Sequence, residues 1–526
     1  MKILIADKVS ERAVEILGAE ESWNVVFLPK KPGSTAAGEI RDADALVVRS
    51  ATKVTAELLA RAERLRVIGR AGVGVDNVDL DAATQKGVVV MNTPGGNAVS
   101  VAEHTLALLL ALARRIPQAD TSMKKGQWEK KNLQGTELRG KMLGLIGLGQ
   151  IGSEVARLAK ALQMEVVAYD PYVTALLAGE LEVNLAPLEE VLKAADFISL
   201  HAAATPETHH LINARTLALA PPGVRIVNCA RGELIDEAAL LAALDCGLVA
   251  GAALDVFESE PPKDSPLVAH PNVITTPHIA GSTEEAQEIV GIRIAEQVRD
   301  FLRLGVARHA VNMPAVSPEE FKKLEPYIQL GEKLGVFLAQ IAGERIREVH
   351  ISYDGGLAEL NTHLVKNAVL KGVLSHALSE PVNLVNAGAL AQQRGVEVAE
   401  VRSGRRAAFS NSLGIALSTE GETTSGLGMV GLGGVLRILG INDIDIEAPL
   451  RGVLLYIRNQ DVPGVIGGVG TILGDRKINI ANFALGRNPQ TQQAIGLVNV
   501  DNHVPDDVLM EIRAIAAVRT ARVVEV

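Results

Sequence analysis

The stretch LGLIGLGQIG, residues 143–152, predicts a strand, a tight turn and the beginning of a helix. Its first four residues are apolar, as in a buried strand, and Gly147, Gly149 and Gly152 complete the pattern G-x-G-x-x-G. In this pattern the first glycine allows the turn, the second lets the backbone approach a pyrophosphate, and the third lets the helix pack closely on the strand. The phosphates then lie at the N-terminus of the helix. The stretch therefore predicts a dinucleotide-binding fold.

The acidic residue that such a site needs follows at the end of the next expected strand, residues 165–169. Asp170 stands there, and its carboxylate can accept hydrogen bonds from the hydroxyls of the adenosine ribose. It would repel a 2′-phosphate, so we expect NAD rather than NADP as the cofactor. A second copy of the glycine pattern, residues 426–431, follows a polar stretch and has no later acidic residue at the right distance. That copy predicts a glycine-rich strand or turn instead of a nucleotide site.

The composition excludes several classes of protein. A chain of 526 residues is long enough for about three or four domains. Apolar residues make up 48% and aromatic residues 3%, which favours an aliphatic core of parallel sheets covered by helices. The net charge of −10 argues against a nucleic-acid partner, because phosphate binding needs a basic face. The two cysteines predict no disulfide framework, and no apolar run is long enough to span a membrane. We expect a cytoplasmic protein with no membrane partner and no metal.

Alternating apolar runs and helical stretches predict an α/β protein with several domains. Two Rossmann-like, doubly wound parallel sheets are expected first. One is a discontinuous substrate-binding domain of residues 1–96 and 282–312, and the other is an NAD-binding domain of residues 97–281. A further α/β domain is expected over residues 315–450. Residues 452–526 follow the order β-α-β-β-α-β, which predicts a ferredoxin-like module.

Two stretches between these domains carry predictions of their own. Residues 314–326, PAVSPEEFKKLEP, combine prolines with charges and predict a linker. Residues 98–115 predict a long helix that is apolar nearly all round and must therefore be buried. A subunit interface is an expected place for it, so we expect a homo-oligomer, either a dimer or a tetramer.

An arginine, a carboxylate and a histidine follow the dinucleotide fold, each just after an apolar strand. Arg231 can clamp a carboxylate with its planar guanidinium. His278 can take the proton of a hydroxyl, and Glu260 can orient the imidazole and raise its pKa. On the residues alone, Glu258 remains an alternative to Glu260. The set is what hydride transfer between a 2-hydroxy acid and a nicotinamide requires.

The chain resembles the D-isomer specific 2-hydroxyacid dehydrogenases. The resemblance is carried by the segments VRSATKVT, GRAGVGVDNVD, VMNTPGGNAVSVAEHT, GTELRGKMLGLIGLGQIG, NCARGELIDE, GAALDVFESEPP and TPHIAGST. The resemblance extends over the whole chain. It is most specific to those family members of the long form that carry an intervening domain and a C-terminal ACT regulatory domain. It implies NAD-dependent oxidation of D-3-phosphoglycerate to 3-phosphohydroxypyruvate, the first step of L-serine biosynthesis.

The resemblance also implies roles for individual residues. It identifies Arg231, Glu260 and His278 as the catalytic set and prefers Glu260 to Glu258. The implied NAD site is lined by Val73, Gly147, Gly149, Gln150, Ile151, Gly152, Asp170, Ala202, Cys229, Ala230, Arg231, Asp255, His278 and Gly281. The implied substrate site contains Arg49, Ser50, Gly74, Arg231 and His278, with Lys131 or its neighbour Lys130, beside Trp128, reaching from another subunit.

Regulation is the last implication. L-serine is expected as the effector, bound in the ACT module by Asn459, Asp461 and Asn479 where subunits meet. Two alternatives stay open. The chain could act on glyoxylate, hydroxypyruvate or lactate, although the long stretch after residue 320 argues against this. It could instead be a nucleotide-sensing protein that needs no turnover, although the intact catalytic set and the ACT module argue against that.

Overall fold

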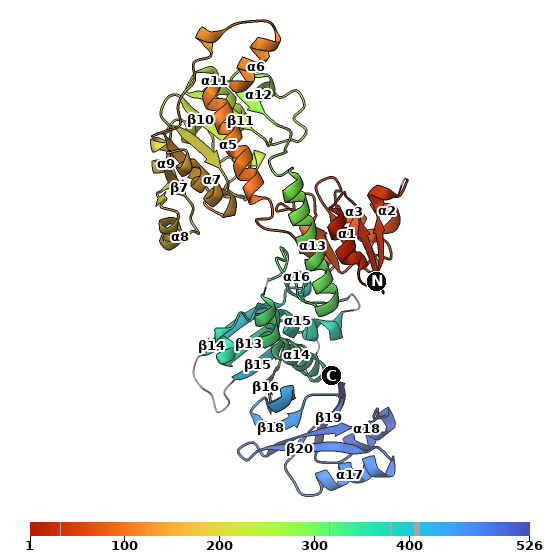
Figure 1. The fold of residues 1–526 in the computed structure, drawn as a ribbon. Coiled ribbons are helices and arrows are strands. Elements are labelled where there is room, and N and C mark those ends of the chain that lie inside the picture. Colours follow the sequence, from red (N-terminus) through yellow and green to blue (C-terminus); the bar gives the residue numbers. More distant parts are fainter. Residues whose placement is uncertain (32, 315, 344, 379–380, 404–410) are drawn as a thin grey trace.

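The computed structural model describes residues 1–526 except 32, 315, 344, 379–380 and 404–410. Four sheets lie along an elongated molecule, with the first sheet between the second and the third (Figure 1). Within the described ranges, no helix combines the length and the apolarity needed to cross a bilayer. The first two sheets along the chain, called the catalytic sheets below because they carry the predicted catalytic and substrate residues, lie in one half of the molecule. The third and fourth sheets lie in the other half (Figure 1).

The first sheet is parallel throughout, with the order β2-β1-β3-β4-β5. Its strands are β1 Lys2–Ile5, β2 Asn24–Phe27, β3 Ala45–Val48, β4 Val67–Arg70 and β5 Val89–Met91, and its helices are α1 Glu11–Gly18, α2 Ala36–Glu39, α3 Ala56–Arg61 and α4 Leu80–Gln85. The chain returns to this sheet much later, through α13 (Glu284–Leu304). Apolar residues of α13 such as Ile294 and Val298 are fully buried in the core of the first sheet. The packing is close because Gly69 on β4 leaves room for them: an added Cβ there would lie 2.7 Å from Val298.

The second sheet is also parallel, with the order β12-β11-β10-β9-β6-β7-β8. Its strands are β6 Met142–Ile146, β7 Glu165–Tyr169, β8 Asn184–Leu185, β9 Phe197–Leu200, β10 Val224–Asn228, β11 Val249–Leu254 and β12 Val273–Thr275. Its helices are α5 Ala98–Arg114, α6 Ile116–Lys124, α7 Gln150–Ala161, α8 Ala175–Glu180, α9 Leu188–Ala194, α10 Ala214–Leu217, α11 Glu237–Asp245 and α12 Pro266–Ala269. The strand order reverses between β6 and β9, and ligands bind at the carboxyl ends of the strands at such a switch point.

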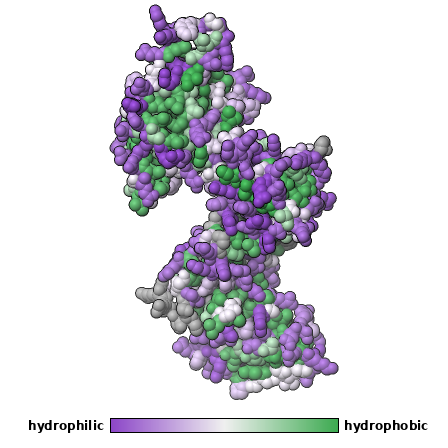
Figure 2. Space-filling model, viewed as in Figure 1, coloured by the Kyte–Doolittle hydropathy of each residue, from purple (hydrophilic) through white to green (hydrophobic). Residues whose placement is uncertain are grey.

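Helix α5, for which a subunit interface was an expected place of burial, buries only one of its faces within the single chain. Leu109 is fully buried against the second sheet, but Val99 is 56% exposed and Leu110 is 37% exposed. The helix therefore buries one face within the chain and leaves apolar side chains on the other. Figure 2 shows apolar side chains gathered on this part of the surface, where Figure 1 draws α5.

The third sheet has the order β14-β13-β15-β16-β17-β18, and its pairs are antiparallel except β13 with β14. Its strands are β13 Glu348–Gly355, β14 Glu397–Ser403, β15 Asn411–Ser418, β16 Thr423–Val430, β17 Leu436–Ile441 and β18 Ile444–Pro449, with helices α14 Pro318–Ile341, α15 His363–Ala377 and α16 Ala387–Gln393. The second glycine pattern begins on β16, a strand as expected. An added Cβ at Gly426 or Gly428 would lie 3.0 Å from leucines of α14, so these glycines let the helix approach the sheet.

The predicted linker over residues 314–326 is wrong from Pro318 onward, because α14 begins there. The Ser317 side chain accepts a hydrogen bond from the Glu320 backbone, and the Glu320 side chain accepts one from the Ser317 backbone. This capping box stabilises the start of the helix, where proline is well tolerated because the first N–H needs no partner. Pro326 then lies inside the helix without ending it.

The fourth sheet has the order β20-β21-β19-β22 and is antiparallel. Its elements are β19 Val453–Gln460, α17 Val465–Asp475, β20 Ile480–Asn488, β21 Gln493–Val500, α18 Asp506–Arg513 and β22 Val518–Glu525. Alternate residues of β19 enter two different cores. Leu455 and Ile457 pack with the helices of this module, whereas Leu454 and Tyr456 pack with residues of the third sheet and α14. The rings of Tyr456 and Phe337 meet edge to face, 6.4 Å apart.

Candidate active site

The turn after β6 has the shape that a dinucleotide needs. Gly147 has φ +98°, which favours glycine, and an added Cβ would lie 2.7 Å from the His201 carbonyl group. At Gly152 an added Cβ would lie 2.2 Å from the Gly147 oxygen, so α7 packs tightly on the turn. At Gly149, which precedes α7, an added Cβ would meet no atom within 4 Å. The space beside Gly149 is open, as the approach of a pyrophosphate requires, so these residues fit NAD.

Asp170 lies directly beside this turn. One carboxylate oxygen accepts a hydrogen bond from the Leu148 backbone at 2.8 Å, and the other accepts from Tyr172 and Val173 at 2.9 and 3.2 Å. These bonds hold the carboxylate in place at the end of β7. Because a carboxylate offers about four acceptor positions, Asp170 keeps capacity for ribose hydroxyls.

Most of the other predicted cofactor residues lie along one sheet edge. Strands β9 to β12 are parallel, and their carboxyl ends carry Ala202, Cys229, Ala230, Arg231, Asp255, His278 and Gly281. Gln150 and Ile151 begin α7, and Val73 comes from the first sheet, after β4. Burial raises the pKa of the Cys229 thiol to about 12, so this cysteine is inert beside the site.

The structure brings His278 and Glu260 together. Nδ1 of His278 lies 2.7 Å from Oε2 of Glu260, and Oε1 of Glu260 accepts a hydrogen bond from the Phe257 backbone. The alternative carboxylate, Glu258, pairs with His210 instead, at 2.6 Å. The Glu260 hydrogen bond raises the pKa of His278 above its ordinary value, although burial of the ring opposes it. Burial by itself would raise the pKa of Glu260, but the imidazole outweighs it and the pKa is lowered.

Asp255 fixes the segment that carries His278. Its side chain is fully buried and accepts hydrogen bonds from the backbones of Ile279 and Ala280, both at 2.9 Å. The Asp255 carbonyl accepts from the His278 backbone at 2.9 Å. His278 has φ +52°, an uncommon conformation for a residue with a side chain, and these bonds determine it. The contribution of Asp255 to a cofactor site is therefore made through the segment that it holds.

Arg231 lies where the two catalytic sheets meet. Its Nη1 donates to the Ala230 carbonyl at 2.6 Å, and its Nη2 lies 3.1 Å from Oδ2 of Asp76, which belongs to the loop after β4. Gly74 of the same loop packs on the guanidinium, since an added Cβ would lie 2.0 Å from Nη2. Arg231 follows β10 and His278 follows β12, on either side of β11, and the first sheet faces them.

Two more arginines end strands of the first sheet. Arg49 follows β3 and donates to the Lys8 carbonyl at 3.2 Å, with the exposed Ser50 beside it. Arg70 ends β4, and its Nε is buried without a hydrogen-bond partner. Burial lowers the pKa of Arg70 to about 10, and the charge of Arg231 adds to this effect. Sequence reasoning, which named Arg49 from the family resemblance, missed Arg70, although LRVIGR also places an arginine at the end of an apolar run.

The lysines predicted to serve the substrate lie apart from this cleft. Lys130 and Lys131 form a short turn, η2 (Lys130–Asn132), next to Trp128, which is 79% exposed. Among the described residues, neither lysine makes an ion pair. The single chain does not bring these lysines to Arg231, so any role in the site requires a second subunit.

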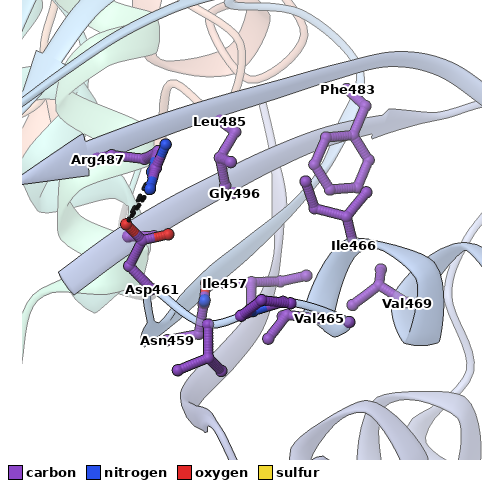
Figure 3. Close-up of a pocket in the computed structure, with 14 residues that line it drawn as sticks. Ile457, Asn459, Asp461, Val465, Ile466, Val469, Phe483, Leu485, Arg487 and Gly496 are labelled. Atoms are coloured by element: carbon purple, nitrogen blue, oxygen red, sulfur yellow. Dashed lines mark hydrogen bonds and ion pairs between the residues drawn. The ribbon is translucent and has the colours of Figure 1, made fainter. Parts of the chain in front are cut away.

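The predicted effector residues divide between two places, of which Figure 3 shows the one that contains Asn459 and Asp461. Asn459 and Asp461 line a cavity of about 270 Å³ in the module built on the fourth sheet. Asp461 pairs there with Arg487, whose Nε donates at 2.7 Å. The opposite wall is apolar and includes Val465, Val469 and Phe483. Asn479 does not line this cavity within the chain, and its side chain donates to Asp501 at 2.6 Å.

Comparison with known proteins finds family models that match three segments of the chain. Residues 106–280 match the D-isomer specific 2-hydroxyacid dehydrogenase NAD binding domain. Residues 323–442 match the D-3-phosphoglycerate dehydrogenase intervening domain, and residues 453–517 match the ACT domain.

Relatives match the chain over its full length. The D-3-phosphoglycerate dehydrogenase of Bacillus subtilis is 42% identical over 524 residues, covering 100% of this chain and 99% of the relative. That of Methanocaldococcus jannaschii is 43% identical, with the same coverage. Among solved structures, D-lactate dehydrogenase from Aquifex aeolicus, complexed with NAD and lactic acid, is 32% identical with a TM-score of 0.51. It covers 60% of this chain and 100% of its own.

Proposed function

This chain belongs to the D-3-phosphoglycerate dehydrogenases of the D-isomer specific 2-hydroxyacid dehydrogenase family, and we propose which of its residues carry the reaction and its regulation. The reaction is the NAD-dependent oxidation of D-3-phosphoglycerate to 3-phosphohydroxypyruvate, the first step of serine biosynthesis. NAD, when bound, accepts the hydride from C2. The residues of the chain must hold two anionic groups and remove one proton.

Arg231 binds the substrate carboxylate in this proposal. A guanidinium matches a carboxylate through two parallel hydrogen bonds. Arg231 lies at the same sheet edge as His278, since their strands β10 and β12 both flank β11. Arg49 and Arg70 then serve the phosphate. The unpartnered buried Nε of Arg70 supports this role, because a buried charged donor without a partner is costly unless a ligand satisfies it.

His278 accepts the proton of the C2 hydroxyl, and Glu260 stabilises the imidazolium that forms. The contact between His278 Nδ1 and Glu260 carries this proposal, because it leaves Nε2 as the base and selects Glu260 over Glu258. At the cofactor, Asp170 binds the adenosine ribose, and the Gly149 backbone meets the pyrophosphate.

A turnover assay tests the reaction together with its selectivity. We expect NAD reduction with D-3-phosphoglycerate and far slower reduction with D-lactate or D-glycerate, which lack the phosphate. NADP should replace NAD poorly. Fast turnover of D-lactate, or no turnover of any of the three acids, would contradict the assignment of the anion-binding arginines.

We further propose L-serine as an effector of the ACT domain. An amino acid carries an ammonium and a carboxylate, and Asp461 and Arg487 offer the complementary charges on one wall of the cavity (Figure 3). Isothermal titration should give heat with serine, and the Asp461→Ala variant should bind it more weakly. The matched control is Asp475→Ala, which alters an exposed carboxylate of the same domain that does not line the cavity. If millimolar serine produces no heat and no loss of rate, the ACT domain does not have this role.

A homo-oligomer is proposed from exposed apolar side chains of α5, of α6 and of the loop that follows α6. Val99, Ile116, Met123 and Trp128 are all more than half exposed in the single chain. A second subunit that covers them would also bring a lysine of the 130–131 pair toward a neighbouring site. Sedimentation of the wild type and of Met123→Glu measures this: the variant should dissociate, whereas an unchanged species would place the interface elsewhere.

A further inference from the structure

The guanidinium of Arg231 is already engaged by a carboxylate of the chain itself. Oδ2 of Asp76 lies 3.1 Å from Nη2 of Arg231. In the described part of the chain, no other carboxylate forms an ion pair with Arg231, Arg70 or Arg49. Asp76 is therefore the carboxylate that forms an ion pair with this group of three arginines. Besides burial, the charges of Arg231 and Arg49 both lower the pKa of Arg70, whereas those of Asp76 and Asp7 raise it.

A substrate with a phosphate and a carboxylate cannot share Arg231 with Asp76 in this position. Two carboxylates on one guanidinium edge repel each other, and the substrate brings additional negative charge. Either Asp76 moves away when the substrate enters, or the substrate does not use Arg231.

The surroundings of Asp76 permit such a movement without a change of fold. Its side chain is 70% exposed, so the carboxylate can turn toward solvent. The backbone stays fixed, because the side chain of the next residue, Asn77, donates to the carbonyls of Arg49 and Thr52, both at 2.7 Å. A change of side-chain rotamer at Asp76 is therefore enough, and an exposed ion pair of this kind holds only weakly.

We propose that Asp76 is an internal counterion that occupies Arg231 in the free enzyme and yields it to the carboxylate of the substrate. The inference rests on the proposed role of Arg231 as the carboxylate clamp. In the free enzyme Asp76 keeps the guanidinium in place and limits repulsion among the arginines. On binding, the substrate replaces one carboxylate with another, so part of its affinity is lost to the competition.

The test is the Asp76→Asn variant of the full chain, with Asp81→Asn as the matched control. Asp81 is an exposed acid on α4, the helix that follows the loop of Asp76, and it forms no ion pair among the described residues, so its removal changes the net charge equally. We expect Asp76→Asn to lower KM for D-3-phosphoglycerate by about two- to five-fold, the size expected for a lost exposed ion pair, with the gain in KM rather than kcat. Asp81→Asn should leave KM at the wild-type value.

Two simpler probes separate displacement from a general electrostatic effect. D-glycerate has the carboxylate without the phosphate, and its binding should tighten in Asp76→Asn. Inorganic phosphate lacks the carboxylate, and its competitive inhibition should change little. An unchanged or raised KM, or equal tightening of both probes, would overturn the proposal.

The Arg231→Lys variant tells this failure apart from a failure of the proposed function. If Arg231 is the clamp, Arg231→Lys should raise KM and lower kcat, whatever Asp76 does. Wild-type kinetics in Arg231→Lys would contradict the clamp itself. Impaired Arg231→Lys with an Asp76→Asn variant that matches the wild type would contradict only the role of Asp76.

Discussion

The contact between Glu260 and His278 sets the pH at which the proposed base can work. In the oxidation direction the imidazole must be neutral, so the rate rises as the pH passes the pKa of His278. Glu260 raises this pKa through its hydrogen bond, so Glu260→Gln should lower it and move the limb of the kcat/KM profile to lower pH. Glu258→Gln is the control, because Glu258 pairs with His210 and should leave the limb in place. A profile of Glu260→Gln that coincides with the wild type would remove Glu260 from the mechanism.

Replacing the imidazole itself should affect the chemical step far more than cofactor binding. His278→Asn should lower kcat by about 10²–10⁴-fold, the usual contribution of a general base. Asparagine is chosen because it tolerates the positive φ of this position. Fluorescence titration should give an NAD affinity near that of the wild type. A kcat within a few-fold of the wild type would assign the proton to another group.

At the scale of single residues, the sequence predicted the catalytic side chains that follow strand ends. It did not predict the features of side chains that depend on burial. Arg231, Glu260 and His278 follow apolar runs, so parallel strands were expected to collect them at one edge. Arg70 also ends an apolar run, but its buried and unpartnered Nε follows from packing around β4 that no local pattern expresses. The pairing of Asp76 with Arg231 joins two sheets and is equally invisible in the sequence.

Two glycine-to-alanine substitutions in the turn between β6 and α7 should distinguish an effect on protein packing from an effect on NAD binding. In Gly152→Ala the new methyl group would meet the Gly147 oxygen, so we expect a loss of stability of about 1–3 kcal/mol, typical of overpacking. In Gly149→Ala the methyl group meets no protein atom, so stability should change little while NAD binds more weakly. Thermal unfolding and NAD titration of both variants measure these effects. Wild-type NAD affinity in Gly149→Ala would place the pyrophosphate elsewhere.

Helices and strands were predicted well where the periodicity of apolar residues indicates them. A helix boundary was predicted poorly where prolines were the main signal. The order β-α-β-β-α-β of the last module was clear from alternating runs, and its sheet has the expected composition. The start of α14 was missed because Pro318 and Pro326 were taken as signs of a linker. Proline is compatible with a first helical turn, and the capping pair Ser317 and Glu320 was the better signal.

At the scale of the whole molecule, the described residues join the two halves through polar contacts and the buried side chain of Val385, whereas the last two sheets share a larger core. The side chain of Asn383 donates to the Gly87 carbonyl at 2.8 Å, and that of Asn386 donates to the Gln85 carbonyl at 3.3 Å. By contrast, the third and fourth sheets bury Phe337, Ile441, Ile446, Leu454, Tyr456, Leu497 and Val524 in one cluster. The sequence was divided into separate domains, and this division did not predict the shared core. The residues of β19 indicate that both faces of the strand are buried, but they do not indicate which element covers each face.

This sharing predicts which truncations of the chain fold well. A chain that ends at Pro314 keeps α13 and Asn312, whose side chain bonds the backbone of β5, so it should fold and bind NAD. A chain that ends at Leu450 is longer, yet it exposes the apolar face that the fourth sheet covers. Each large apolar side chain left uncovered costs roughly 1.5–3 kcal/mol, so the longer chain should bind a hydrophobic dye and aggregate. Soluble yield, dye fluorescence and NAD titration of both chains measure this difference. If the chain ending at Leu450 is as monodisperse as the full chain, the intervening and ACT domains are independent units, and any signal between them must pass through their linker instead of a common core.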